Sequence, residues 1–232
     1  MQRLFNWLEP SAQAPTGPRH PRHPGWKEYT PTLRVGSPAQ FHRVTLRPLE
    51  FSDAQPWSEQ RKRNQAVLEA VEPTIQGSWE QAHSMQGWKQ YFYPLNQAAY
   101  QGRAVPFAIV VDGHFAGQIT LDELRGMPWQ DCVVGYWVDA LLWGRGIATA
   151  ACALAVDHAF RRVGVHRVQA TYLPDNPASG AVLQSVGFEQ EGLLRGNMHI
   201  NGRWQDHFCV GLNRDRYTST AVERLKRAGR VF

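Results

Sequence analysis

Seven consecutive residues, Trp143 to Thr149, have the composition of an anion-binding turn. They read Trp-Gly-Arg-Gly-Ile-Ala-Thr and lie between a strand-like run, Cys132 to Val138, and a helical run. Glycines allow backbone N–H groups to converge on an anion, and a helix start adds its positive dipole. From Arg145 to Arg162 the single acidic residue is Asp157, near the far end. The stretch therefore predicts a loop that binds phosphate groups.

The type of phosphate ligand is narrowed by what the loop lacks. It has no Lys-Ser/Thr ending of the kind that ATP-binding loops use, and no third glycine of a dinucleotide fingerprint. A Gly-Arg-Gly turn before a helix is also a common structural connection. If the loop has a ligand, the pattern favours another cofactor that carries a pyrophosphate.

Length and charge favour one globular domain with basic ends. The chain has 232 residues, is 43% hydrophobic and has a formal net charge of +5, which is enough apolar material for one substantial core. Residues 1–43 carry six Lys/Arg against two Asp/Glu, and residues 214–232 carry the same numbers. The middle is therefore net −3, which argues against a nucleic-acid-binding fold and is compatible with a cationic acceptor.

The three cysteines, Cys132, Cys152 and Cys209, are far apart and lie in apolar runs. A disulfide framework or a zinc site is therefore not expected, and a reducing cytoplasm fits best. No basic-then-apolar signal segment opens the chain, and the longest apolar run, around Ala148 to Val156, is too short to span a bilayer. We expect a cytoplasmic protein without a metal and without membrane association.

The N-terminal segment is rich in proline, with seven of the 15 prolines in the first 38 residues. Proline lacks a backbone donor and disfavours helix at the preceding residue, so residues 1–43 are predicted to form an extended basic arm. An alternative is a segment laid over the domain surface and anchored by Phe5, Trp7, Trp26 and Tyr29. Residues 218–232 are predicted to be a basic tail.

The first half of the domain, residues 44–217, is predicted to begin with a strand at Val44 to Leu46. A helix capped by Ser52 follows, and then a second helix whose start has the capping-box spacing of Ser78 and Gln81. Asp112-Gly113 predicts a hairpin between the strand-like runs 107–111 and 115–121.

The second half continues with a strand at 132–138, the glycine loop and a helix on which Asp157 and Arg161 pair on the solvent side. A half-buried strand at 168–172 and a short helix stopped by Gly187 come next. Asn201-Gly202 predicts a second hairpin, between 195–200 and 203–210.

This order, with the glycine loop after the fourth strand, resembles the GNAT acetyltransferase superfamily over residues 44–217. The more specific motifs are similar to the RimJ/RimL type, the ribosomal-protein alanine N-acetyltransferases, and comprise 135–138 (GYWV), 176–179 (NPAS), 186–192 (VGFEQEG) and 201–207 (NGRWQDH). The resemblance implies an α/β (α+β) GNAT fold with a mixed, mostly antiparallel, twisted central sheet flanked by helices on both faces. It also implies acetyl-CoA as cofactor, with CoA as product.

The resemblance implies which residues contact the cofactor. The loop would grip the pyrophosphate mainly through backbone amides, Val138 would offer backbone groups to the pantetheine and thioester, and Asn176 would bond the cofactor arm. Without the resemblance, an Asn in Asp-Asn-Pro is a turn former. The expected cofactor-binding residues are Val138, Trp143, Gly144, Arg145, Gly146, Ile147, Ala148, Thr149, Asn176 and Ser179.

Catalytic roles are assigned with the same resemblance. Ser179 lies where this branch places a hydroxyl near the sulfur, and the position where many relatives have a tyrosine is Leu183. An α-amine has a pKa of about 8, so a water chain ending on a carboxylate suffices as base. Met198 stands where a RimL-like relative offers a catalytic Glu. The expected catalytic residues are Ser179, Tyr136 and Glu123, and those expected to bind the acceptor are Trp57, Glu72 and His199.

The sequence thus predicts an acetyltransferase that moves the acetyl group of acetyl-CoA to a protein N-terminal α-amine by direct attack. The predicted acceptor is a ribosomal protein beginning with Ala or Ser, and the basic ends are predicted to contact the ribosome. Two alternatives stay open. One is an acceptor that is a small amine, such as an aminoglycoside, polyamine or amino acid, and the other is a non-catalytic module that binds ribosomal RNA.

Overall fold

One twisted sheet of eight strands organises the chain in this computed structural model, which describes residues 20–37 and 39–232. The strand order is β1-β2-β3-β4-β5-β6-β8-β7, and of the neighbouring pairs among the described residues only β5 and β6 run parallel. The strands are β1 (Leu33–Ser37), β2 (Gln40–Pro48), β3 (Val105–Val111), β4 (His114–Arg125), β5 (Asp131–Val138), β6 (Arg167–Tyr172), β7 (Glu189–Ile200) and β8 (Arg203–Asn213).

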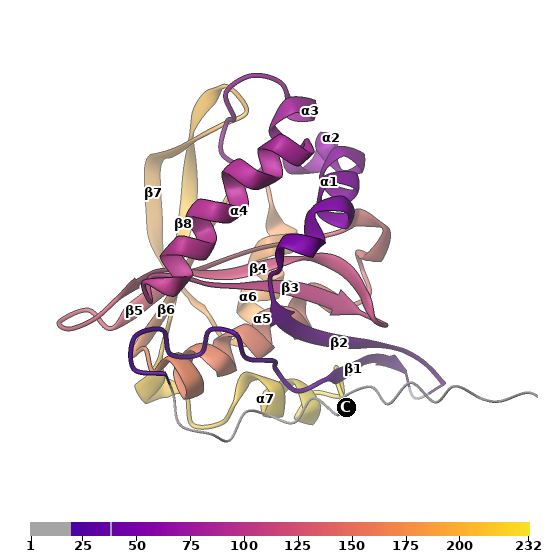
Figure 1. Cartoon of the computed structure of the whole chain (residues 1–232). Coiled ribbons are helices and arrows are strands. Elements are labelled where there is room, and N and C mark those ends of the chain that lie inside the picture. The colour runs from indigo at the N-terminus through magenta and orange to yellow at the C-terminus, as the bar shows by residue number, and fades with distance from the viewer. Residues whose placement is uncertain (1–19, 38) are drawn as a thin grey trace, which may run out of the picture.

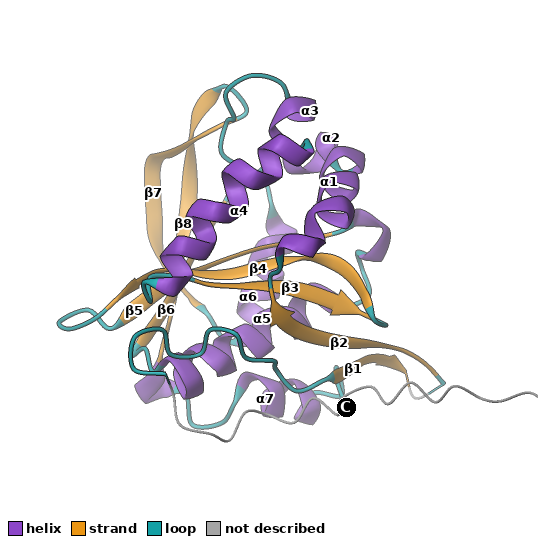
Figure 2. Cartoon of the chain, in the orientation of Figure 1, coloured by secondary structure: helices purple, strands orange, loops and turns teal. Residues whose placement is uncertain are grey.

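Helices cover both faces of the sheet (Figures 1 and 2). Helices α1 (Ala54–Arg63), α2 (Gln65–Leu68), α3 (Trp79–Ala82) and α4 (Met85–Tyr100) lie on one side. On the other side lie α5 (Ile147–His158), α6 (Pro177–Val186) and α7 (Ala221–Arg227). A mixed, mostly antiparallel sheet between two helical layers confirms the predicted fold class.

Two hydrophobic clusters hold these layers. The larger one lies between the sheet and α5, and most residues of α5 are buried because β2, β4, α6 and α7 surround this helix. The smaller one joins α1 and α4 to the sheet and consists of Leu49, Ala54, Trp57, Trp88, Phe92, Ala108 and Phe115. The β7–β8 hairpin rises beyond the sheet on the side of α4 (Figure 1), and most of β7 is exposed.

The start of the first helix differs from its prediction. Glu50, rather than Ser52, forms a capping box with Asp53, and a short 3-10 turn leads into α1. Arg47 also donates hydrogen bonds to both carboxylate oxygens of Asp53. Asp53 is therefore held both by the capping box and by the arginine. A hydroxyl is a common N-cap, but an acid that is already fixed by an arginine satisfies the same orphan amides.

Residues 20–32 lie on the domain instead of extending away from it. Trp26 is buried, the Nε2–H of His158 donates to the carbonyl oxygen of Gly25 at 2.7 Å, and Arg162 pairs with Glu28. The surface-laid alternative therefore describes this segment, although Tyr29 is exposed and is not an anchor. Phe5 and Trp7 lie outside the described residues, and the extended arm stays a prediction for residues 1–19.

The C-terminal residues also pack on the domain, and they correct one further expectation. Asp157 is half-buried rather than on the solvent side, because its carboxylate accepts the backbone N–H groups of Ala221, at 2.8 Å, and Val222, at 3.2 Å. These are first-turn amides of α7, which have no partner within the helix itself. Burial raises the pKa of Asp157 to about 6.

The predicted boundaries at residues 43 and 218 therefore fall in segments that join the domain. Leu33 and Val35 of β1 and Leu225 of α7 are part of the main core, because each carries an apolar side chain that the sheet or α5 covers. Among the described residues, no helix is long and apolar enough to cross a membrane, and no group of His, Cys, Asp and Glu is arranged to hold a metal.

Substituting His158→Gln tests the buried imidazole that anchors the N-terminal segment. Burial lowers the pKa of His158 to about 4, whereas the unfolded chain titrates near 6.5. The unfolded state therefore binds more protons between these values, and stability falls as the pH falls through this window. Between pH 7 and pH 5 we expect the wild type to lose roughly 2 kcal/mol more than the variant.

The measurement is the free energy of unfolding in urea at both pH values. The pKa of His83 is lowered in the same direction, but this residue is present in both proteins and its effect cancels. Equal losses in the wild type and the variant would contradict a neutral, buried His158.

Candidate active site

A gap opens inside the sheet where β5 and β6 part. The two strands pair over three positions, from Asp131 with Arg167 to Val133 with Gln169. Beyond Val133, β5 continues to Val138 paired with β4 alone. Gly135 lies in this part of β5, and a Cβ atom added there would meet nothing within 4 Å. The gap therefore exposes strand backbone to a ligand.

The glycine loop joins the open end of β5 to α5. Gly144 and Gly146 have positive φ angles of 73° and 76°, which residues with side chains rarely adopt, and Gly146 is the N-cap of α5. Ile147 is fully buried, so only its backbone can face a ligand, whereas Ala148 and Thr149 are half-buried in the first helical turn. The loop thus presents backbone amides at a helix start.

Trp143 and Arg145 hold this loop from its two sides. The indole N–H of Trp143 donates to the carbonyl oxygen of Val138 at 2.8 Å, so this carbonyl already has a partner. Arg145 donates to His42 Nε2 at 3.2 Å, and Asp112 accepts from the other ring nitrogen at 2.7 Å. Trp143 therefore ties the loop to the end of β5, and Arg145 ties it to β2.

Two hydroxyl groups meet across the gap. The hydroxyl oxygens of Tyr136, on β5, and Ser179, on α6, are 3.1 Å apart. Asn176 is the N-cap of α6 and accepts the backbone N–H of Ser179 at 3.2 Å, so it fixes the serine in place. Burial raises the pKa of Tyr136, which keeps its hydroxyl protonated and able to donate.

The loop after α2 contacts the tip of the β7–β8 hairpin on the side of the sheet that holds α1 and α4 (Figure 1). We call these two joined segments the arch. The backbone N–H of Thr74 donates to the carbonyl oxygen of His199 at 2.8 Å, and Gly202 donates to the Thr74 hydroxyl at 3.0 Å. Pro73 and Ile200 form a bridge beside them. Segments more than 120 residues apart in the sequence thus form one contiguous frame.

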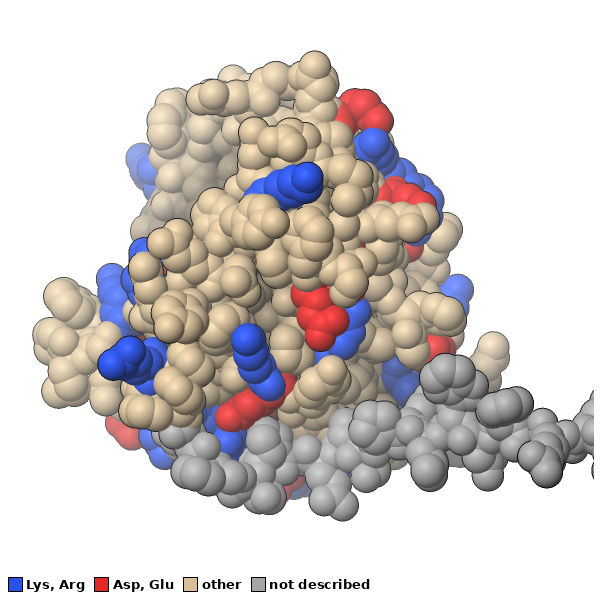
Figure 3. Space-filling model, viewed as in Figure 1, with Lys and Arg blue, Asp and Glu red and all other residues tan. Residues whose placement is uncertain are grey.

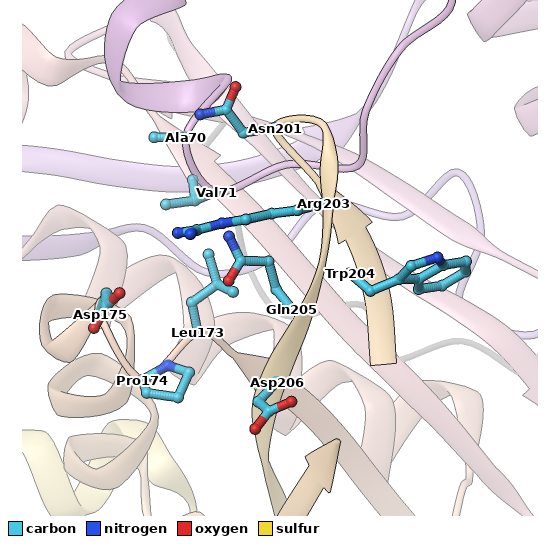
Figure 4. A pocket seen from close by; sticks show the side chains of 10 residues that line it. All are labelled: Ala70, Val71, Leu173, Pro174, Asp175, Asn201, Arg203, Trp204, Gln205 and Asp206. Atoms are coloured by element: carbon cyan, nitrogen blue, oxygen red, sulfur yellow. The ribbon is translucent and has the colours of Figure 1, made fainter. Parts of the chain in front are cut away.

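A hollow of about 470 Å³ adjoins the arch (Figure 4). The loop that leads from β6 to Asn176 forms one wall, and the loop after α2 and the hairpin form the others. Arg203 extends toward Val71 in the view, whereas the Trp204 ring points away. The lining residues are Ala70, Val71, Leu173, Pro174, Asp175, Asn201, Arg203, Trp204, Gln205 and Asp206.

An arginine that the sequence analysis did not assign to the site organises the arch. Arg61 bonds both carboxylate oxygens of Glu72, each at 2.5 Å. Its guanidinium lies over three indole rings, those of Trp57, Trp79 and Trp137, at 5.2 to 5.7 Å. One side chain thereby joins α1, α3, β5 and the arch. Its sequence position carries no sign of these partners.

Gln118 is a second residue that sequence reasoning missed. It lies on β4 opposite Trp137, is 3% exposed, and its amide nitrogen contacts the hydroxyls of Tyr91, at 2.5 Å, and Thr120, at 3.1 Å. Its amide oxygen has no partner among the described residues. The one signal in the sequence that could have identified Gln118 is a glutamine within a buried strand, because buried side-chain amides seldom lack hydrogen bonds.

Three of the expected site residues do not join the hydroxyl pair. Trp57 is 2% exposed because it packs against Trp88 and Tyr91, so it supports the site and does not line a cleft. Glu123 is exposed within the irregularity of β4 between Asp122 and Arg125, four residues past the partner of Tyr136. His199 alternates with Met198 along β7 and lies beside the exposed Trp204 ring.

Comparison with known protein families identifies the family of this chain. A model described as an acetyltransferase (GNAT) domain matches residues 43–189. The chain belongs to the GNAT acetyltransferase family. It is an N-acetyltransferase, and the donor that enzymes of this family use is acetyl-CoA.

Two of the proteins that this GNAT chain resembles are a RimJ and a ribosomal-protein alanine N-acetyltransferase. RimJ of Mycobacterium smegmatis in complex with CoA-disulfide has a TM-score of 0.86 and 40% identity, covering 90% of this chain and 98% of its own. The ribosomal protein uS5-alanine N-acetyltransferase of Escherichia coli (strain K12) is 25% identical over 197 residues, 84% of this chain and 97% of its own. The probable N-acetyltransferase YjcK of Bacillus subtilis (strain 168) is 29% identical over 171 residues, 73% and 93% respectively.

The two loop glycines allow a matched test of the cofactor site. A Cβ atom at Gly146 would lie 2.9 Å from Val35 Cγ1, whereas one at Gly144 meets nothing within 4 Å, and both glycines have positive φ. Gly146→Ala therefore adds a steric cost to the conformational cost that Gly144→Ala bears alone. We expect isothermal titration with CoA to show a loss of about tenfold or more for Gly146→Ala and a smaller loss for Gly144→Ala.

Unchanged CoA affinity in Gly146→Ala would remove this loop from the cofactor site. Far-UV circular dichroism of both variants separates a local effect on binding from loss of the fold.

Proposed function

We propose that this enzyme acetylates the N-terminal α-amine of a protein, and that the acceptor is a ribosomal protein beginning with Ala or Ser. The observation that carries the proposal is the arch. Contacts of Pro73 and Thr74 with the hairpin tip close a frame on the side of the sheet that holds α1 and α4. We propose that an acceptor reaches the gap beside this frame as a single extended strand.

A free chain end meets this requirement better than an internal segment does. An extended chain advances about 3.4 Å per residue, so two or three residues carry an α-amine beneath a frame one loop thick. A lysine within a folded surface would have to bring its neighbours with it. The similarity to RimJ and to a uS5-alanine N-acetyltransferase supports the same class of acceptor.

The lower pKa of an α-amine also favours a chain end over a lysine side chain as the acceptor. An α-amine has a pKa of about 8, so roughly a tenth is neutral at pH 7, whereas lysine, with a pKa of about 10.4, is neutral in roughly one molecule in 2,500. No strong base is then needed. We propose that Glu72, which Arg61 holds at the arch, attracts the chain end as a carboxylate.

Acetyl-CoA, when bound, supplies an acetyl thioester for direct attack by the amine. We propose that the loop residues Trp143 to Thr149, with backbone of β5 up to Val138, hold it. Ser179 Oγ would give its proton to the leaving thiolate and take one from the Tyr136 hydroxyl, at 3.1 Å, and the proton that the amine loses on attack would restore the Tyr136 hydroxyl. The raised pKa of Tyr136 keeps its hydroxyl protonated before the transfer and favours its return to the protonated form, and Asn176 keeps Ser179 in reach.

Ser179→Ala and Tyr136→Phe test the proton path. We expect each to lower kcat about tenfold to a hundredfold and to change the CoA dissociation constant less than about twofold, because only the proton donor is lost. Ser185→Ala, on the same helix, should leave kcat unchanged. An unaltered kcat in Ser179→Ala would show that water or another group protonates the thiolate.

A peptide panel tests the acceptor. A peptide that begins with Ala or Ser should be acetylated at least about a hundredfold faster than the same peptide with a blocked N-terminus and a free lysine. Mass spectrometry of peptides incubated with enzyme and acetyl-CoA locates the acetyl group. Transfer mainly to lysine, or to small amines alone, would overturn the proposed acceptor and favour the small-amine alternative.

Ribosome contact through the basic ends and a cytoplasmic location stay predictions. On the face drawn in Figure 3, the described Lys and Arg side chains are scattered, and several lie beside an acidic one. Scattered and partly neutralised positive charge does not form the continuous basic surface that attracts a nucleic acid to a face of a protein. The distribution therefore favours recognition of the acceptor at the arch.

A further inference from the structure

The end of the chain forms an additional edge beside β1. The backbone groups of Arg34 and Phe232 exchange two hydrogen bonds of 3.0 Å, and Val231 bridges Val35. Val231 and Val35 are both 3% exposed, so the segment is packed as well as paired. The end segment and β1 lie outside residues 43–189, the part that the GNAT model matches.

This edge and the glycine loop enclose a second hollow of about 240 Å³, which we call the tail hollow. The first turn of α5 forms one wall. Two arginines and no acidic residue occur among its lining residues in the described part of the chain, which are Val35, Gly36, Arg145, Gly146, Thr149, Gly229, Arg230 and Val231. A hollow with this lining suits an anion.

The two arginines approach the tail hollow from different elements. Arg230 donates to the Ser185 hydroxyl at 2.7 Å and so leans on α6, whereas Arg145 donates to His42 on β2 at 3.2 Å. A guanidinium carries five N–H donors, and each of these contacts uses one of them. Both side chains are therefore held in place and keep donors for a ligand.

The position of the tail hollow indicates which part of a ligand it receives. Its lining contains no residue of the gap, neither Val138 nor Tyr136 nor Ser179. If the thioester end of CoA lies in the gap and the pyrophosphate lies at the loop, a group on the far side of the loop belongs to the nucleotide end. That end carries a ribose 3′-phosphate, a dianion near neutral pH.

We propose that Arg230, with Arg145, binds the ribose 3′-phosphate of CoA, so that the C-terminal segment completes the cofactor site. The inference rests on the proposed position of CoA at the glycine loop. It does not depend on the identity of the acceptor.

Isothermal titration with CoA and with dephospho-CoA, which lacks the 3′-phosphate, tests the proposal on the full chain. The wild type should bind CoA about tenfold more tightly than dephospho-CoA, since a charge-assisted pair with phosphate is lost in the second case. Arg230→Ala should weaken CoA binding about tenfold and leave dephospho-CoA binding within about twofold. Arg145→Ala, which leaves the tail intact, should also reduce the preference for CoA.

Three controls separate charge from structure. Arg227→Ala removes an exposed arginine of α7 that does not line the tail hollow, and it should keep the preference. Ser185→Ala removes the contact that holds Arg230 but keeps the guanidinium, and Arg230→Lys keeps the positive charge. Both variants should therefore retain most of the preference for CoA over dephospho-CoA. Thermal unfolding midpoints check that each variant is folded.

Equal weakening of both ligands in Arg230→Ala, or unchanged CoA binding, would overturn the proposal. Acetylation of the peptide panel at saturating acetyl-CoA would then still report on the proposed acceptor, because the acceptor does not contact the tail hollow. The two proposals therefore fail independently.

Discussion

The parting of β5 and β6 after three residue pairs is the constraint on which the rest of the structure depends. Buried backbone groups need partners, and a sheet normally supplies them by continuing its ladder. Here the ladder stops inside the sheet, and the backbone of β5 beyond Val133 faces a gap. A ligand that is itself extended and carries amide groups, as the pantetheine arm of CoA does, matches such an edge. The loop, the N-terminus of α6 and the arch all lie around this gap.

The sequence predicted the local parts of this arrangement well, because their determinants are local. The glycine turn before α5, the stop at Gly187 and the hairpin at Asn201-Gly202 each depend on a few neighbouring residues. The prediction that Asp157 faces solvent was wrong. Helical periodicity identifies the polar side of a helix, but it does not show whether water or another helix covers that side. The partners of Asp157 belong to α7, more than 60 residues further along.

The parts of the site that were missed are those that only tertiary contacts create. Arg61 looked like an ordinary residue of a polar helix, and its three indole neighbours come from positions 57, 79 and 137. Trp57 was expected to bind the acceptor, yet its ring fills the smaller hydrophobic cluster. Asn176 shows the opposite case. Its turn-forming role and its position near the site are compatible, because capping α6 is what fixes Ser179.

The closure of the arch has a consequence for how such an enzyme changes over evolution. Thr74 N–H bonds the carbonyl oxygen of His199, and Pro73 meets Ile200, through main-chain groups that nearly any residue supplies. Side chains that point into the adjoining hollow can therefore vary while the frame persists. A scaffold of this kind separates the requirement to admit one kind of molecular end from the choice of which partner presents it. New partners can then be acquired by substitution alone, without rebuilding the backbone.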